Sequence, residues 1–208
     1  INAGIDFSLF SRRLYGKIDY YSKQGSDILG RVTIPMVQGS RNEVFNNAEI
    51  SNQGVEVMLG TEMPISKDWH WSGQITFAYN KNKVKSLYNN SLAYYTMVQG
   101  GAQVEGYALN PLFSYSYGGV QNVGSESKPL MKPVVNLTDG EVMPFGGTTT
   151  MEGRDFLVYQ GTTVAPCNIG MSHTISYRDL SLAFTLTGKF GHKFRRTGFN
   201  YAGRGGIP

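Results

Sequence analysis

The stretch CNIGMSHTISYRDLSLAFTLTGKFG, residues 167–191, has the pattern of two strands joined by a tight turn. Large apolar side chains alternate with small polar ones up to Tyr177, the pair Arg178-Asp179 interrupts the alternation, and it then resumes on the other parity. Pairing Tyr177 with Leu180 across the turn places the apolar residues of both arms on one face. The stretch therefore predicts a β-hairpin with one apolar and one polar face.

Two more segments obey the same rule. If Leu9 faces Leu14, apolar residues of both arms share one face, and Asp6 stands opposite Lys17 on the other. A slip of one residue would invert both faces, so a register that satisfies both is informative. The predicted hairpins cover about residues 3–22, 54–80 and 168–190, and one more strand is expected over about 105–118.

Composition narrows the class of protein. The chain has 208 residues, of which 40% are hydrophobic and only 16% charged, and 26 are glycine, which favours an all-β fold with many turns. The net charge of +4 is small and scattered, so nucleic acid is not an expected partner. The single Cys167 and three separated histidines predict no metal site and no cofactor, and no catalytic constellation supports an enzyme.

Connection lengths favour a membrane barrel. Connections inside the hairpins are short, whereas long surface loops are expected over about 23–50, 86–104 and 119–166. Short turns at one end and long loops at the other are typical of an outer-membrane barrel, whose strands need about 9–11 residues to cross the bilayer. The alternative is a soluble, secreted β-sandwich that binds carbohydrate or protein, because its strands alternate too. Aromatic residues expected in interfacial girdles are Phe10, Tyr20, Tyr21, Trp69, Trp71 and Tyr79.

Four stretches of the sequence resemble the barrel region of SusC/RagA-type TonB-linked outer-membrane transporters. In the phrase that begins at Asn46, Ala48 replaces a usual glycine, while other positions agree with the family, namely Glu49, Ile50, Asn52, Gly54 and Glu56. The phrases are NAGIDFSLFSRRLYGKIDYYSKQGSDIL (2–29), NNAEISNQGVEVMLGTEMP (46–64), WHWSGQITFAYNKNKV (69–84) and NIGMSHTISYRDLSLAFTLTGKFGHKFRR (168–196).

The resemblance implies an antiparallel up-and-down meander within a transmembrane barrel of 22 strands. Nothing in the chain resembles the plug domain, the TonB box or the final barrel strands, so an internal piece of about seven or eight strands is expected. The resemblance further implies import of a large nutrient, a glycan or a peptide, across the outer membrane of a Gram-negative bacterium. The implied partners are a SusD-like surface lipoprotein and TonB, which would act through the missing N-terminal part.

Aromatic and amide side chains in the loops are the candidate ligand contacts, because rings cover the apolar face of a sugar while amides bond its hydroxyls. Packing within the loops is the competing role for the same tyrosines. The basic segment at residues 189–196 is expected at the long-loop end, where it meets either lipopolysaccharide phosphates or solvent. The candidates for the ligand are Tyr88, Asn89, Asn90, Tyr94, Tyr95, Gln99, Tyr115 and Tyr117, and those for lipopolysaccharide are Lys193, Arg195 and Arg196.

Overall fold

The structure is a computed structural model that describes residues 1–33, 42–87, 94–100, 103–145 and 155–196. These residues form eleven strands and one short helix. The elements are β1 (Asn2–Leu9), β2 (Leu14–Thr33), β3 (Asn42–Pro64), β4 (Trp69–Leu87), α1 (Tyr94–Gln99), β5 (Pro111–Tyr115), β6 (Tyr117–Asn122), β7 (Met131–Asn136), β8 (Val142–Pro144), β9 (Leu157–Thr162), β10 (Cys167–Tyr177) and β11 (Leu180–Phe190).

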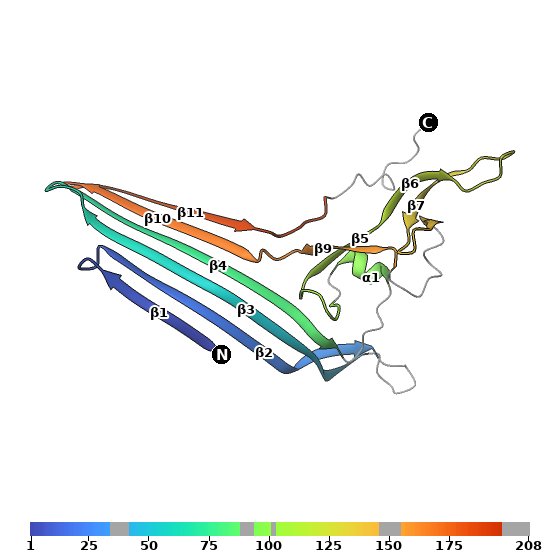
Figure 1. Ribbon diagram of the computed structural model, residues 1–208, viewed down its shortest axis with the longest axis horizontal. Coiled ribbons are helices and arrows are strands. Elements are labelled where there is room, and N and C mark those ends of the chain that lie inside the picture. Colours follow the sequence, from blue (N-terminus) through green and yellow to red (C-terminus); the bar gives the residue numbers. More distant parts are fainter. Residues whose placement is uncertain (34–41, 88–93, 101–102, 146–154, 197–208) are drawn as a thin grey trace.

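One six-stranded antiparallel sheet dominates the molecule. Its order is β1-β2-β3-β4-β10-β11, an up-and-down meander in which each strand pairs with the next one that belongs to the sheet. Between β4 and β10 the described residues leave the sheet and form a separate region at its far end, with a ribbon of β5 and β9 and a three-stranded sheet of β6, β7 and β8 (Figure 1). We call this segment, residues 88–166, the insert.

The predicted hairpin registers are confirmed. Leu9 lies opposite Leu14, and Tyr177 lies opposite Leu180. In the middle hairpin Val57 faces Phe77, as the alternation requires. All three hairpin turns lie at one end of the sheet, and the longer connections lie at the other (Figure 1).

The two faces of the sheet differ in character. Apolar side chains form continuous rows across the strands on one face, which we call the outer face, and many of them are exposed, with Ile5 at 70% and Leu182 at 64%. The opposite, inner face carries small and polar residues. Its rows include Ser8, Tyr15, Gly60, Gln74, Ser172 and Thr185.

Aromatic residues mark both limits of the outer apolar rows. Trp69 and Tyr177 form a cross-strand pair at the turn end, with ring centroids 4.7 Å apart. Tyr20 and Tyr79 close the rows at the other end. The span between these limits equals β10, which has 11 residues. At about 3.3 Å per residue and a tilt of about 40°, such a strand rises about 25 Å, the height of the apolar band of an outer-membrane barrel.

Strands β2, β3 and β4 are longer than predicted, so the loop expected over residues 23–50 is wrong for most of its length. Pairing of β2 with β3 continues to Thr33 and Asn42, past register shifts between Gly25 and Leu29. β4 likewise extends to Leu87, two residues into the loop expected over 86–104. Polar residues there weaken the alternation, but backbone hydrogen bonds between strands do not depend on apolar side chains.

The strand predicted over residues 105–118 is also wrong. The chain turns at Gly106, where φ is +89°, and the segment then divides into β5 and β6, which belong to different sheets. Neither strand joins the main sheet, which therefore contains six strands rather than seven or eight. The loop expected over 119–166 contains most of β6 and all of β7, β8 and β9.

Most buried apolar side chains of the described residues lie in the insert, and two, Ala48 and Val84, lie where β3 and β4 approach it. Within the described residues, one cluster joins Met97, Val104 and Phe113, against which Tyr107 and Leu157 pack. The sheet is thus a two-faced wall without a core of its own. In the described part of the chain, no helix is long and apolar enough to cross a membrane. The other buried apolar residues are Ala48, Val84, Val134, Val135 and Phe156.

We expect Gly54→Ala to destabilise the sheet. A Cβ atom at Gly54 would lie 2.6 Å from the carbonyl oxygen of Tyr79 and 2.4 Å from the Tyr21 ring. Such overpacking costs about 1–3 kcal/mol. The measurement is the urea midpoint of the full-length barrel that contains this chain, followed by its heat-modifiable migration in a gel.

Gly25→Ala is the matched control, because a Cβ atom there would first meet Ile28 at an ordinary 3.4 Å. Equal midpoints for the two variants would contradict the close approach of the strands at Gly54.

Candidate functional site

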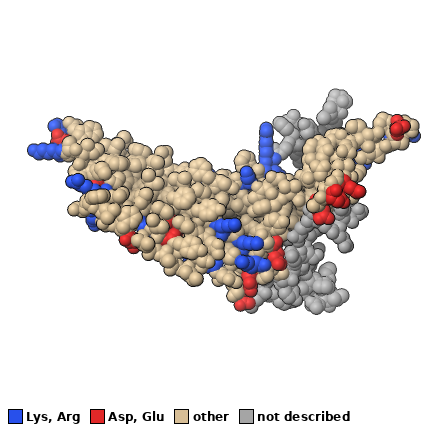
Figure 2. Space-filling view, viewed as in Figure 1, with Lys and Arg blue, Asp and Glu red and all other residues tan. Residues whose placement is uncertain are grey.

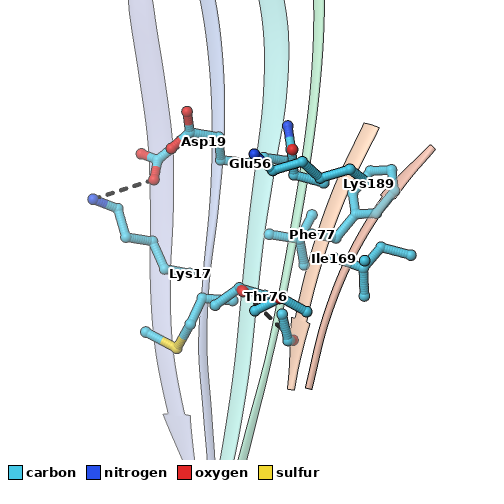
Figure 3. Close-up of a pocket in the computed structure, with 14 residues that line it drawn as sticks. Lys17, Asp19, Glu56, Thr76, Phe77, Ile169 and Lys189 are labelled. Carbon is cyan, nitrogen blue, oxygen red and sulfur yellow. Dashed lines mark hydrogen bonds and ion pairs between the residues drawn. The ribbon is translucent and has the colours of Figure 1, made fainter. Parts of the chain in front are cut away.

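The inner face contains a shallow hollow of about 470 Å³ over the middle of the sheet. Small side chains on adjacent strands form its floor, namely Ala78, Gly170 and Thr187, and Thr76 lies within 3.5 Å of the Gly170 carbonyl oxygen. Charged side chains stand on both sides of the hollow (Figure 3). Because the floor residues are short, the wall leaves room for a solute or for another part of the protein.

Charges on this face are unevenly distributed. The Lys17 ammonium lies 3.2 Å from the Asp19 carboxylate on the same strand, although the register places Lys17 opposite Asp6. Glu56 stands opposite Asp19, and Lys189 lines the far side of the hollow (Figure 3). The hollow thus has a mainly acidic flank on β2 and β3 and a basic flank on β11, an arrangement suited to a polar occupant.

Tyrosine rings cover glycines across the strands of the inner face. A Cβ atom at Gly60 would lie 2.3 Å from Tyr15, and one at Gly54 would lie 2.4 Å from Tyr21. Tyr21 therefore faces inward, and its predicted place in an interfacial girdle is wrong. Its neighbour Tyr20, also expected in the girdle, lies on the outer face, because successive residues of a strand point to opposite faces.

An aromatic cluster forms the interior of the insert. Phe156 is fully buried, and its ring lies 5.2 Å from that of Tyr94 and 6.2 Å from that of Tyr115. Tyr107 packs against Phe113 at 5.0 Å. Burial, with a smaller contribution from Tyr94, raises the pKa of the Tyr115 phenol above its ordinary value. These contacts are those of packing residues.

The candidate ligand residues therefore divide into groups. Tyr94 and Tyr115 meet each other, with centroids 6.4 Å apart, inside the aromatic cluster. Tyr117 is 66% exposed, and Gln99 is exposed at the end of α1. Neither group lines the hollow on the inner face. Tyr88, Asn89, Asn90 and the side chain of Tyr95 lie outside the described residues.

A cleft of about 460 Å³ lies where β4 and β10 separate. Pairing of β10 with β4 stops at Cys167 and Tyr79, and the last bond beyond it joins the Asn80 amide to the Pro166 carbonyl at 2.8 Å. Sequence reasoning missed this cleft. The stretch YNKNKVK, residues 79–85, carries a signal that could have found it. Lys81 and Lys83 follow Tyr79 at every second position and so point to the same face of the strand. The cleft is lined by Tyr79, Asn80, Lys81, Asn82, Lys83, Gly106, Tyr107, Ala108, Tyr159, Thr162, Val164, Ala165 and Pro166.

The basic segment after β11 packs against the insert. The Arg195 guanidinium donates to the carbonyls of Val98 and Phe113, so it links α1 to β5. The Lys193 amide donates to the Thr162 carbonyl at 2.8 Å. A structural role for Arg195 thus competes with the lipopolysaccharide contact, which for Lys193 and Arg196 stays a prediction.

The histidines and the cysteine do not form a metal site. His173 lies on the outer face, where its Nδ1 accepts a hydrogen bond from the Trp71 indole N–H at 3.2 Å. Cys167 is a free, partly exposed thiol at the end of β10. Across the part of the chain that the structure describes, no three His, Cys, Asp or Glu side chains lie close enough together to hold a metal ion.

The fold and its surfaces define an open section of a β-barrel wall with an inserted surface region. Among curated proteins, SusC of Bacteroides thetaiotaomicron, a TonB-dependent receptor, is 24% identical over 197 residues, which is 89% of this chain and 18% of that protein. A TonB-dependent receptor of Formosa agariphila is 34% identical over 120 residues, covering 57% of this chain and 11% of the receptor. No protein-family model matches the chain.

Solved structures agree on the fold. The RagAB peptide transporter superposes with a TM-score of 0.65 at 20% identity, over 89% of this chain and 20% of the matched chain. The RagAB peptide importer in its open-open state gives a TM-score of 0.68 at 22% identity, over 92% and 20%. The resemblance to a section of SusC/RagA-type TonB-dependent transporters is confirmed. The chain spans about a fifth or less of the length of these relatives. They are receptors and transporters, consistent with the prediction of no enzymatic activity.

We expect Phe156→Ala to loosen the insert without affecting the sheet. Removing a fully buried ring costs about 3 kcal/mol, so local opening should become roughly 100-fold more frequent. The measurement is the rate at which external protease cleaves the insert of the full-length transporter.

Tyr117→Ala removes a similar ring that is mostly exposed, and it should change this rate by less than about threefold. Equal acceleration by both variants would argue against a packed aromatic interior.

Proposed function

We propose that the chain forms part of the wall and surface of an outer-membrane transporter that imports a large nutrient in a TonB-dependent manner. The observation that carries this proposal is the outer face, whose exposed apolar rows end at aromatic residues on both sides. Exposed rows of this size are unfavourable in water but stable against hydrocarbon. The number of 22 strands in the complete barrel stays a prediction.

The competing β-sandwich has less support. A sandwich would bury the face that includes Ile5, Leu182 and Leu186 against a second sheet. These side chains are exposed, and the other described sheets consist of short strands at the far end of the molecule (Figure 1). The sheet is open at β1 and β11, so its backbone groups need partner strands before it can lie in lipid.

The class of nutrient is proposed from the relatives. The matched solved structures are named as peptide transporters or importers, and we propose a peptide or a glycan as the cargo here. The polar hollow on the inner face and the exposed Tyr117 and Gln99 support passage of a polar solute. A SusD-like lipoprotein would act as the surface partner, and TonB would act through a part of the protein outside this chain.

The orientation of the sheet can be tested by quenching from the lipid phase. In a Cys167→Ala background, a fluorophore on Leu186→Cys should face lipid, whereas one on Thr187→Cys should face the lumen. We expect a nitroxide-labelled lipid to quench the first by more than half and the second by less than about a fifth, because nitroxide quenching requires close contact. The full-length transporter in lipid vesicles is used. Equal quenching at both positions would exclude the proposed wall.

Transport is tested separately in cells. Deleting the full-length gene should abolish uptake of either size-selected oligosaccharides or size-selected oligopeptides, and a proton uncoupler should have the same effect on wild-type cells. Uptake of both classes that survives deletion would overturn the proposed cargo. Uptake that requires the gene but survives the uncoupler and the loss of TonB would overturn the proposed energy coupling.

A further inference from the structure

The cleft between β4 and the segment that leads into β10 lies directly above the outer apolar rows. Tyr79 belongs to both features, because it ends the apolar rows and also lines the cleft. Lys81 and Lys83 follow on the same strand with the same parity, so their side chains leave the sheet on the outer face. Both are exposed. The first polar groups above the apolar band on this strand are therefore cationic.

The depth of Lys81 matches that of lipid headgroups, and Lys83 starts just beyond them with a side chain long enough to reach back. Each step of two residues along a tilted strand rises about 5 Å, so Lys81 and Lys83 lie about 5 Å and 10 Å above Tyr79. The headgroup layer extends roughly 5–8 Å beyond the hydrocarbon on each side of a bilayer. In Figure 2, basic side chains appear towards the insert end of the long strands, with acidic side chains beside them.

The residues directly opposite the two lysines carry no charge. Their partners on β3 are neutral, since Lys81 lies opposite Gln53 and Lys83 lies opposite Ser51. A third cation lies close by, because the Lys193 side chain rests on Gly161, with its Cγ 3.1 Å from the position of a Cβ atom there. Gly161 precedes Thr162, which lines the cleft. Lysines from β4 and from the segment after β11 thus stand near the rim of the cleft.

The interior of the cleft suits a sugar. Its wall includes the rings of Tyr107 and Tyr159, with centroids 4.9 Å apart. The Asn82 amide also lines it, with its Oδ1 accepting a hydrogen bond from the Leu109 N–H at 2.7 Å, which leaves the amide N–H groups to donate. Burial raises the pKa of the Tyr159 phenol above its ordinary value. Aromatic faces beside amides bind pyranose rings, and lysines bind phosphate.

We infer that this cleft binds the phosphorylated sugar headgroup of a glycolipid of the outer leaflet. The phosphate would lie between Lys81 and Lys83, the sugar would enter the cleft, and the acyl chains would follow the apolar rows below Tyr79. The site differs from the basic segment at 189–196 considered first, because only Lys193 of that segment lies near it. The inference rests on the proposed membrane orientation of the sheet.

The test uses the full-length transporter in neutral detergent, with bis-phosphorylated lipid A as the probe and native mass spectrometry as the readout. Lys81→Gln together with Lys83→Gln should weaken binding by about 25-fold, at about fivefold for each lysine near an anionic headgroup. The matched control is Lys128→Gln with Lys132→Gln, which removes two exposed charges from the β6–β7 hairpin and its turn and should leave binding within twofold. Unchanged heat-modifiable migration establishes that each variant is folded.

Three results would overturn the inference. They are equal weakening in both double variants, equal binding of lipid A from which the phosphates have been removed, and saturation of the site by inorganic phosphate alone at the same concentration as the lipid. Failure of the headgroup inference can be told apart from failure of the proposed function, because uptake and lipid-phase quenching at residue 186 are measured independently. If the fluorophore at residue 186 is still quenched from the lipid phase but lipid A binds without preference for the cleft lysines, the wall stands and only the headgroup site is excluded.

Discussion

The hydrogen bonds between adjacent strands are the constraint on which the structure depends. Inside a bilayer no water is present to satisfy a backbone N–H or C=O group, so a crossing strand must bond to a neighbour on each side. The meander from β1 to β11 provides these bonds for every strand except its two edges. Once the backbone is fixed in this way, side chains can only alternate between two environments, and the sequence responds with apolar residues on one face and short polar ones on the other.

This division explains where the molecule is packed and where it is not. A wall one sheet thick has no interior, and its stability in a membrane comes from its neighbours, from lipid on one side and from the contents of the lumen on the other. The insert lies beyond the apolar rows and must hold itself together in water, so the buried rings of Phe113 and Phe156 occur there. Two kinds of solvent thus produce two kinds of architecture in one chain.

Sequence patterns predicted the wall well because alternation with a fixed register is a strong signal. The pairing of Leu9 with Leu14 and that of Tyr177 with Leu180 follow from parity alone. The prediction failed where polar residues and a register shift interrupt the alternation, as in the extension of β2 to Thr33 and that of β3 from Asn42. It also failed in the insert, where β5 pairs with β9 across a long stretch of chain and no local pattern specifies the partner. The cleft was missed because it is formed by three segments distant in sequence.

Arg178 has a consequence for how neighbouring hairpins are joined. Its amide donates to the Asp68 carbonyl at 3.0 Å, and its guanidinium lies 3.4 Å from the Asp68 carboxylate, so the turn after β10 is fastened to the turn before β4. These two hairpins are separated in the chain by the whole insert. The insert therefore begins and ends at two strands, β4 and β10, that are held together independently of it. Its length and composition can change while these strands stay aligned. One barrel wall can in this way support surface inserts of many different lengths and sequences.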